Sequence, residues 1–168
     1  MRHLGILAFG ILAVAGPVAA PAAQGDLWLD VNVGSRHSED RYLWRGQVRE
    51  YNERNLGLGL GYEWRSWLEA KAGWFENSYE KTSVYAVVNA KWDLAGRSRW
   101  LVAPGISGGL ITGYHDTPEQ TGTVAPWGLL TLSLGNENRW RVVLGYLPSQ
   151  LALENSVDVA TLQLSWRL

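Results

Sequence analysis

Apolar and polar residues alternate along most of the chain after residue 26. Because successive side chains of an extended strand point to opposite faces, a period of two predicts strands with one apolar and one polar face. In the clearest run, Leu56–Trp64, apolar or aromatic residues alternate with glycine or glutamate. Eight such runs occur, at 27–34, 56–64, 68–75, 83–92, 99–111, 123–134, 139–147 and 157–168.

Two barrel types fit eight strands of this kind. In a transmembrane barrel the apolar face points to lipid, and closure removes the unpaired sheet edges that a bilayer cannot solvate. In a soluble barrel the apolar face points into the lumen. We favour the first type, so the sequence predicts an all-β, eight-stranded antiparallel transmembrane up-and-down β-barrel over residues 23–168.

Connector lengths and tryptophan positions favour the membrane barrel. Transmembrane barrels have short periplasmic turns and longer outer loops. Long connectors at 36–54, 76–82, 112–122 and 148–156 alternate with short ones at Arg65, Asp93–Ser98 and Gly135–Asn138. Amphipathic aromatic rings prefer the membrane interface. Six of the ten tryptophans lie near the short turns or the C-terminus, where they would form a periplasmic girdle: Trp64, Trp67, Trp92, Trp100, Trp140 and Trp166.

The first residues have the layout of a secretory signal. A basic start precedes an apolar run from Leu4 to Ala15 and a small-residue segment that ends at Gln24. This layout predicts a signal peptide over residues 1–22, with cleavage after Ala20 or Ala22. The apolar run is too short for a transmembrane helix. We therefore expect an exported protein of the bacterial outer membrane.

Charge and composition exclude several classes of function. The formal net charge is −1, which gives no sign of a nucleic-acid partner. The chain has no cysteine, so disulfides and thiolate metal sites are absent. Neither a phosphate-cradling glycine loop nor clustered metal ligands occur, and we expect no nucleotide or metal cofactor. We expect a monomer.

Glycines and prolines in the strands leave two questions open. Glycine is frequent on the predicted lumen face and either opens a cleft there or permits barrel curvature. The residues are Gly57, Gly59, Gly61, Gly73, Gly105, Gly109 and Gly145. Pro104, Pro126 and Pro148 cannot donate to the strand ladder. They indicate either a lateral opening for a lipid chain or bulges near strand ends.

Two outer-loop motifs resemble a known family. Arg49-Glu50-Tyr51-Asn52-Glu53-Arg54 leads into the glycine-rich strand and is similar to a Tyr-Asn-Glu-Arg segment of the lipid A palmitoyltransferases. Phe75-Glu76-Asn77-Ser78-Tyr79-Glu80-Lys81 is similar to that family's Phe-Lys-Asp-Ser-Trp-Asn-Lys loop. Gly145-Tyr146-Leu147-Pro148 and the C-terminal strand are similar too, so the resemblance covers about residues 30–168. It implies transfer of a fatty acyl chain from a phospholipid to lipid A.

The resemblance also implies site residues. His37 takes the place of the general base, since histidine titrates near neutral pH. Ser78 takes the place of the family's serine, as nucleophile or as hydrogen-bonding positioner. Gly57, Gly59 and Gly61 would line the acyl site. Asn89 would lie at its floor, where a polar residue shortens or spoils a hydrocarbon well.

The third catalytic position departs from the family. Asn77 stands where the family has aspartate, and an amide orients an imidazole without stabilising imidazolium by charge. Glu39, Asp40 or Asp116 could substitute for it, and restoring aspartate at position 77 would then raise activity. The family's amphipathic helix before the first strand is also missing, because Gln24-Gly25-Asp26 runs directly into that strand.

Other functions remain open at this point. The main alternative is a non-catalytic small outer-membrane barrel with a structural or adhesion role. A lipid A deacylase would need a histidine on the late strands, whereas the mature chain has only His37 and His115, both in loops. His115-Asp116 is either an acid–base pair or ordinary loop polarity.

Overall fold

The computed structural model describes residues 25–168 except 97–99, 116, 118–122, 137 and 150–156. The predicted signal peptide and Asp116 lie outside the described residues. No helix in the described part of the chain is long and apolar enough to cross a membrane. The strands are β1 (Asp26–His37), β2 (Arg41–Trp44), β3 (Gln47–Glu50), β4 (Gly57–Arg65), β5 (Leu68–Glu76), β6 (Thr82–Lys91), β7 (Trp100–Thr112), β8 (Val124–Asn136), β9 (Trp140–Leu147) and β10 (Val159–Arg167).

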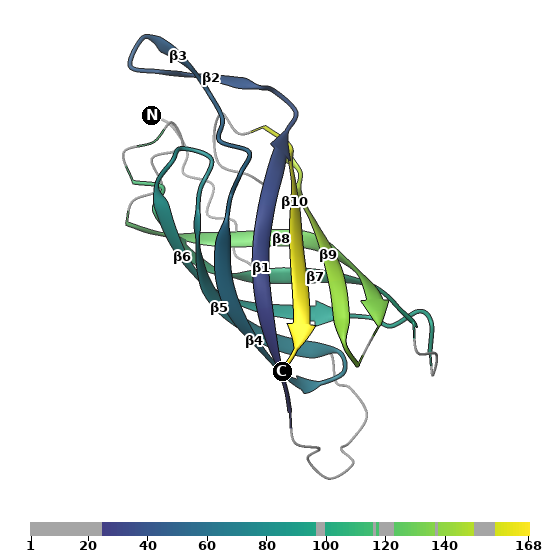
Figure 1. The fold of residues 1–168 in the computed structure, drawn as a ribbon. Coiled ribbons are helices and arrows are strands. Elements are labelled where there is room, and N and C mark those ends of the chain that lie inside the picture. Colours follow the sequence, from purple (N-terminus) through teal and green to yellow (C-terminus); the bar gives the residue numbers. More distant parts are fainter. Residues whose placement is uncertain (1–24, 97–99, 116, 118–122, 137, 150–156) are drawn as a thin grey trace, which may run out of the picture.

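Eight of these strands form one closed antiparallel barrel (Figure 1). Their order is β1-β10-β9-β8-β7-β6-β5-β4, and β1 closes the sheet by pairing with both β10 and β4. The predicted fold class is therefore confirmed. We call the end with the short connectors and the C-terminus the turn end, and the opposite end the loop end.

The remaining two strands form a hairpin that the sequence pattern did not predict. β2 and β3 pair with each other inside the predicted long loop 36–54. In Figure 1 this hairpin projects from the loop end, beyond the wall of the barrel. The hairpin is too short to give a clear alternation, which explains why the segment reads as a loop.

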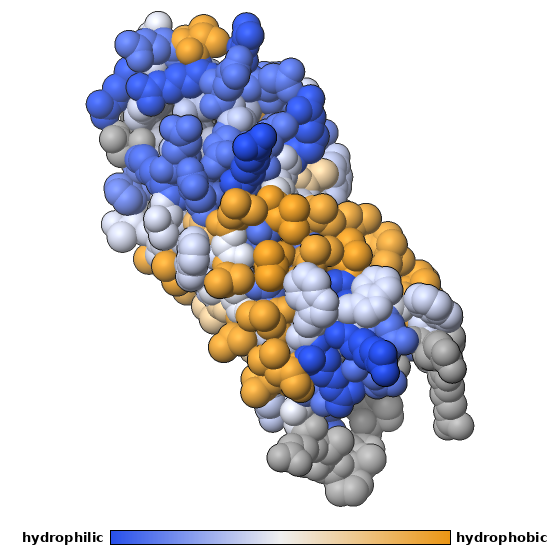
Figure 2. Space-filling view, in the orientation of Figure 1, coloured by the Kyte–Doolittle hydropathy of each residue, from blue (hydrophilic) through white to orange (hydrophobic). Residues whose placement is uncertain are grey.

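The apolar face of the strands points outward. Leu58 is 47% exposed, Leu60 54% and Val88 47%. Figure 2 shows apolar residues gathered in a belt around the middle of the visible wall, with hydrophilic residues at the loop end. The orientation expected of a soluble barrel is therefore wrong for this chain. The six tryptophans predicted near the turn end are all exposed, by 38–58%.

Charged side chains fill the lumen toward the turn end. Arg141 is 1% exposed and donates to Glu63 at 2.9 Å and to Glu69. Its guanidinium also lies over the ring of buried Trp28, 3.9 Å from the centroid. Lys91 pairs with Glu63 at 2.6 Å. Three cations and three carboxylates thus balance in this group: Lys71, Lys91, Arg141, Asp30, Glu63 and Glu69.

Apolar and aromatic side chains fill the lumen toward the loop end. Tyr85, Val87, Ile111 and Ala125 are buried together there, and partly buried aromatic rings pack against them. The Tyr85 hydroxyl also lies against two of the lumen glycines, Gly59 and Gly73. A Cβ at Gly59 or Gly73 would collide with this hydroxyl, and one at Gly61 would collide with Glu69. Side chains therefore occupy the space beside Gly59 and Gly61, so at these two positions the structure disfavours the cleft, one of the two open alternatives.

Gly57 has a different requirement. A Cβ at this position would collide with the backbone of β5 at Trp74 and Phe75. Glycine therefore permits close approach of two strands at Gly57.

A one-residue bulge in β1 reverses which side chains enter the lumen. The pairing of β1 with β10 runs in register up to Asn32, then shifts so that Gly34 pairs with Leu162 and Val33 is extra. Without the shift His37 would share the outward face of Leu29 and Val31. With the shift His37 turns inward and is 5% exposed. A β-bulge therefore aims this side chain.

In the described part of the chain, Pro104 and Pro126 lie in strand segments that pair with only one of their two neighbouring strands. The β6–β7 pairing stops at Gly105, next to Pro104. β7 and β8 pair without a register shift across both Pro104 and Pro126, so neither proline marks a bulge between these strands. The ladder from β8 to β9 runs from Leu130 to Asn136. Among the described residues, the part of β8 that contains Pro126 therefore pairs with β7 alone.

We predict that replacing Arg141 destabilises the barrel strongly. Arg141→Met leaves Glu63 and Glu69 buried with less compensating charge, which costs about 3–5 kcal/mol of unfolding free energy. Urea unfolding of the refolded protein in lipid vesicles, followed by tryptophan fluorescence, measures the change. Arg167→Met is the matched control, because the Arg167–Asp26 pair is about one-third exposed and its loss costs about 1 kcal/mol or less. Equal losses in the two variants would contradict the proposed importance of the buried group.

Candidate functional site

The structure brings His37 and Ser78 together at the loop end. His37 ends β1, and Ser78 lies in the connector between β5 and β6, 41 residues later. The imidazole Nε2 and the Ser78 Oγ are 2.9 Å apart. The histidine is almost fully buried, whereas Ser78 is partly exposed, so the contact lies at the boundary between the interior and the surface. A serine hydroxyl bonded to a buried imidazole is the arrangement that general-base catalysis requires.

Tyr51 holds the imidazole ring in place. The two rings stack with centroids 4.2 Å apart and an interplanar angle of 4°. Tyr51 is packed in turn against Tyr42, at 4.8 Å, and Tyr79, at 5.8 Å. Since stacking restricts rotation of the imidazole, Tyr51 is a positioning residue for His37.

The two residues after Tyr51 link the first long loop to the rest of the site. The Asn52 backbone N–H donates to the Ser78 carbonyl at 2.9 Å, and its side-chain amide donates to the Asn77 carbonyl at 3.2 Å. Glu53 accepts from the His37 backbone N–H at 3.4 Å and pairs with Arg36 at 2.7 Å. Sequence patterns alone did not predict a role for Tyr51 or Glu53. Both residues belong to the loop motif 49–54, and their place in this motif was the signal that could have identified them.

Asn77 does not contact the imidazole, which corrects its expected role as the orienting residue. It is fully buried, and its Oδ1 accepts from the backbone N–H groups of Tyr79 and Lys81 at 2.9 and 3.0 Å. Its Nδ2 donates to the Ser83 hydroxyl at 3.1 Å and to the Gly113 carbonyl at 3.0 Å. With both ends of the amide used, Asn77 fixes the shape of the connector that carries Ser78.

No carboxylate takes the place of the missing aspartate in the described part of the chain. The His37 Nδ1 is buried and has no hydrogen-bond partner there. Asp40 pairs instead with Arg36 at 3.0 Å, and Glu39 is exposed. His115 is exposed as well. Ser78 and His37 therefore form a dyad, with Tyr51 supplying the orientation that a carboxylate would give in a triad.

Burial lowers the pKa of His37 below its ordinary value of 6.5. His37 lies at the loop end, above the apolar belt, beside the charged pair Arg36 and Glu53. The charge of Glu53 raises the pKa of the imidazole and that of Arg36 lowers it, while burial has the largest effect. The imidazole is therefore neutral at pH 7 and able to accept a proton.

Asn89, the predicted floor of an acyl site, points into the middle of the lumen. It is 3% exposed and accepts a hydrogen bond from the Thr131 hydroxyl at 3.2 Å. On its loop-end side lies the apolar group around Tyr85 and Val87. Asn89 thus stands at the boundary between the apolar and the charged parts of the lumen.

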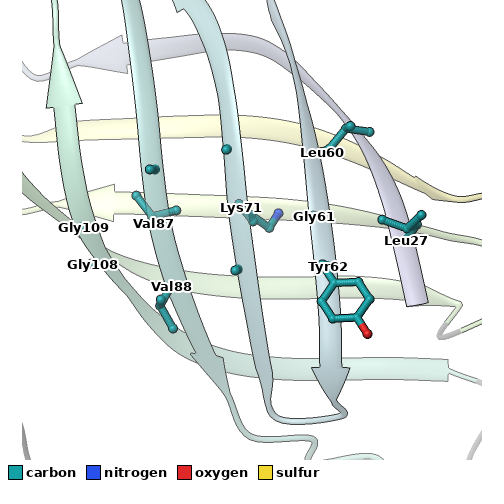
Figure 3. Close-up of a pocket in the computed structure, with 12 residues that line it drawn as sticks. Leu27, Leu60, Gly61, Tyr62, Lys71, Val87, Val88, Gly108 and Gly109 are labelled. Carbon is teal, nitrogen blue, oxygen red and sulfur yellow. The ribbon is translucent and has the colours of Figure 1, made fainter. Parts of the chain in front are cut away.

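An apolar cavity lies on the outer wall. It has a volume of about 490 Å³ and spans β1 and β4 to β7 (Figure 3). Small outward residues, Ala70, Ala72, Ala86 and Gly108, leave it as a shallow apolar depression that Leu60 and Tyr62 border. A smaller cavity of about 250 Å³ lies at the loop end. Within the described residues, no group of three or more acidic or histidine side chains is arranged to hold a metal ion.

Comparison with known proteins supports the fold. No protein-family model and no curated protein matches the chain. A de novo designed transmembrane β-barrel aligns with a TM-score of 0.57 at 11% identity, covering 88% of this chain and 99% of the design. The solution NMR structure of the designed barrel TMB2.3 aligns with a TM-score of 0.53 at 14% identity, covering 86% and 96%. The N-terminal barrel domain of Pseudomonas aeruginosa OprF aligns with a TM-score of 0.45 at 14% identity, covering 86% of this chain and 100% of that domain.

These features define the class of the protein. It is a small β-barrel of the transmembrane type, with an apolar outer wall, a filled lumen and a serine–histidine pair at one end. At these identities the designed barrels show the fold alone.

We predict that Asn77→Asp destabilises the protein. Aspartate keeps the two acceptor bonds but cannot donate to Ser83 and to the Gly113 carbonyl. The lost donors lower the unfolding free energy by about 1–3 kcal/mol. Thermal unfolding in detergent micelles measures the change. Asn136→Asp is the control, since its side-chain oxygen accepts from the Asn138 N–H at 3.0 Å and aspartate can do the same. An unchanged or raised stability of Asn77→Asp would contradict the assigned role.

Proposed function

We propose that this protein is a bacterial outer-membrane acyltransferase that moves a fatty acyl chain from a phospholipid to lipid A. The hydrogen bond between the buried imidazole of His37 and the hydroxyl of Ser78 carries the proposal. The resemblance of its two loops to the lipid A palmitoyltransferases supports it, because the residues of both motifs meet at this hydrogen bond. With the loop end outside the cell, the dyad would face the leaflet that holds lipid A.

A covalent route fits the dyad. His37 Nε2 takes the proton of the Ser78 hydroxyl as Oγ attacks the ester carbonyl of the phospholipid. The lysophospholipid leaves as an alcohol, with the proton returned by the imidazolium. His37 then deprotonates a lipid A hydroxyl, which attacks the Ser78 acyl ester and releases the serine. Detection of an acyl group on Ser78 would distinguish this route.

A direct route uses the same two residues differently. His37 deprotonates the lipid A hydroxyl, and this oxygen attacks the phospholipid ester without an acyl-enzyme. The lysophospholipid leaves as an alcohol, with its proton supplied by the imidazolium. Ser78 then orients the imidazole through the 2.9 Å hydrogen bond. The lowered pKa of His37 suits both routes, since each begins with a neutral imidazole.

One part of the barrel wall has features that suit entry of a lipid chain. The first part of β8, residues 124–129, has no β9 partner among the described residues, and Pro126 lies in that part. The adjoining lumen is apolar, with Ile111 and Ala125 buried there. An acyl chain entering at this level would replace apolar contacts by apolar contacts, although the aromatic side chains would have to move aside.

A non-catalytic barrel is the second candidate function. The unpartnered Nδ1 of His37 favours it, because a dyad lacks the charge that stabilises imidazolium. The filled space beside Gly59 and Gly61 favours it as well. The same loops would then serve a structural or adhesion role.

Expression in an outer-membrane host tests the proposal. We expect a mass increase of lipid A by one acyl chain, and its loss in His37→Ala and in Ser78→Ala, measured by mass spectrometry. His115→Ala is the control, since this histidine is exposed. Heat-modifiable gel mobility checks that each barrel has folded. An unchanged lipid A profile with the wild-type protein would support the non-catalytic barrel.

The rate of acyl transfer should depend on pH through His37. Because only the neutral imidazole acts as base and its pKa is lowered, the rate should fall with decreasing pH only below 6.5. Glu53→Gln should move this fall to still lower pH, since the Glu53 charge raises the pKa of His37. Transfer measured in mixed micelles between pH 4 and 8 gives both profiles. A shift toward higher pH in Glu53→Gln would contradict the assignment.

A further inference from the structure

The cavity at the loop end lies between the β2–β3 hairpin and the connector that carries Ser78. Its volume is about 250 Å³, and Tyr79, the residue after Ser78, forms part of its wall. Pockets for drug-sized ligands begin at about 300 Å³, so this cavity suits a smaller group. It is large enough for one monosaccharide-sized group and too small for a whole lipid.

Cations and aromatic rings dominate the lining. Arg45, Arg49 and Lys81 contribute positive charge, and Tyr42, Trp44 and Tyr79 contribute ring surfaces. No carboxylate is among the described residues that line the cavity. Positive charge selects an anion, and guanidinium groups match the geometry of phosphate. Flat aromatic surfaces offer packing area to the C–H face of a sugar ring.

The neighbouring carboxylates are engaged elsewhere. Glu50 pairs with Arg41 on the opposite face of the hairpin, at 3.4 Å. Asp40 and Glu53 both pair with Arg36, at 3.0 and 2.7 Å. Each of these three carboxylates thus has a cationic partner that does not line the cavity. Lys81 Nζ donates to the His115 carbonyl at 2.8 Å.

The register of the hairpin directs its side chains in two sets. Tyr42 pairs with Arg49, and Trp44 with Gln47, so Tyr42, Trp44 and Arg49 share the face that lines the cavity. The opposite face carries Arg41 and the exposed pair Leu43 and Val48, each 67% exposed. One face is thus built toward the cavity and the other toward the surroundings.

The tip of the hairpin has an unfavourable residue for its backbone. Arg45 and Gly46 both have positive φ, 49° and 78°. A two-residue turn of this kind prefers asparagine or glycine at the first position, because a side chain with a Cβ is strained there. The arginine occupies this position with its guanidinium over the Trp44 ring, 5.1 Å from the centroid. Strain of this kind is typical of functional positions.

We propose that this cavity binds a phosphorylated sugar, the head group of a glycolipid acceptor. The arginines and Lys81 would hold the phosphate, and the rings of Tyr42, Trp44 and Tyr79 would pack against the sugar. A chain of ring contacts runs from the cavity to the dyad, with Tyr79–Tyr42 at 4.9 Å, Tyr42–Tyr51 at 4.8 Å and Tyr51–His37 at 4.2 Å. The role as acceptor site rests on the proposed acyl transfer, whereas the binding itself does not.

Binding of lipid A to the full mature protein in detergent micelles, measured by calorimetry, tests the proposal. Arg45→Asn and Arg49→Gln should each weaken binding of lipid A about tenfold, the loss expected for one charge-assisted contact. Arg45→Asn keeps a turn residue that the backbone prefers, so it should fold at least as well as the wild type. Arg41→Gln is the matched control, because it removes the same charge from the opposite face of the same hairpin.

Three further ligands separate the contributions of the phosphate and of the sugar to binding. Lipid A stripped of its phosphates should bind about as weakly to the wild type as intact lipid A binds to the arginine variants. Glucosamine 1-phosphate should compete with lipid A better than inorganic phosphate does, and Trp44→Ala should abolish that advantage. Equal competition by the two would show a simple anion site and overturn the sugar assignment.

The outcomes distinguish this site from the acyl transfer. Phosphate-dependent binding without any acyl transfer would support the cavity and remove the proposed function. Acyl transfer with a KM that is the same for intact and dephosphorylated lipid A would support the function and overturn the cavity. Unchanged lipid A binding in both arginine variants would overturn it as well.

Discussion

The closed ladder of backbone hydrogen bonds is the constraint on which the rest of this structure depends. A sheet in contact with hydrocarbon must leave no edge unpaired, and eight strands closed by β1 between β10 and β4 meet that demand. Closure at this strand number leaves a bore that side chains alone can fill. The polar face of every strand therefore enters a narrow, shared interior, where charges such as Arg141, Glu63 and Glu69 must compensate one another.

The interior is divided along its axis, and the division bears on function. The turn-end part is filled by paired charges, which leave no room for an apolar chain. The loop-end part is apolar, and it adjoins the region where β8 lacks a β9 partner among the described residues. The dyad lies at the rim of that apolar part. A site for an ester, with its polar atoms at the rim and its hydrocarbon beneath, is compatible with this order.

Loop contacts give the site its geometry. Tyr51, Asn52 and Glu53 each make a different contact with the dyad or its supports, by stacking, by backbone bonding to the Ser78 connector and by capping the end of β1. The two motifs used for the resemblance are therefore also the segments that meet in space. The hairpin of β2 and β3 adds a second surface beside them, where cations and aromatic rings occur without a carboxylate among the described lining residues.

The sequence by itself determined the eight barrel strands and the end at which the loops gather, because these follow from local alternation and connector length, and the tryptophan positions favoured an outward apolar face. It also singled out His37 and Ser78 through the loop motifs. Only the tertiary structure decided that the two side chains meet. That depends on the bulge at Val33, which reverses the face of His37 and leaves no mark in a period of two. The use of Asn77 by the connector, and the filling of the glycine space by Tyr85, were likewise undecided, since both depend on residues that only the closed barrel brings together.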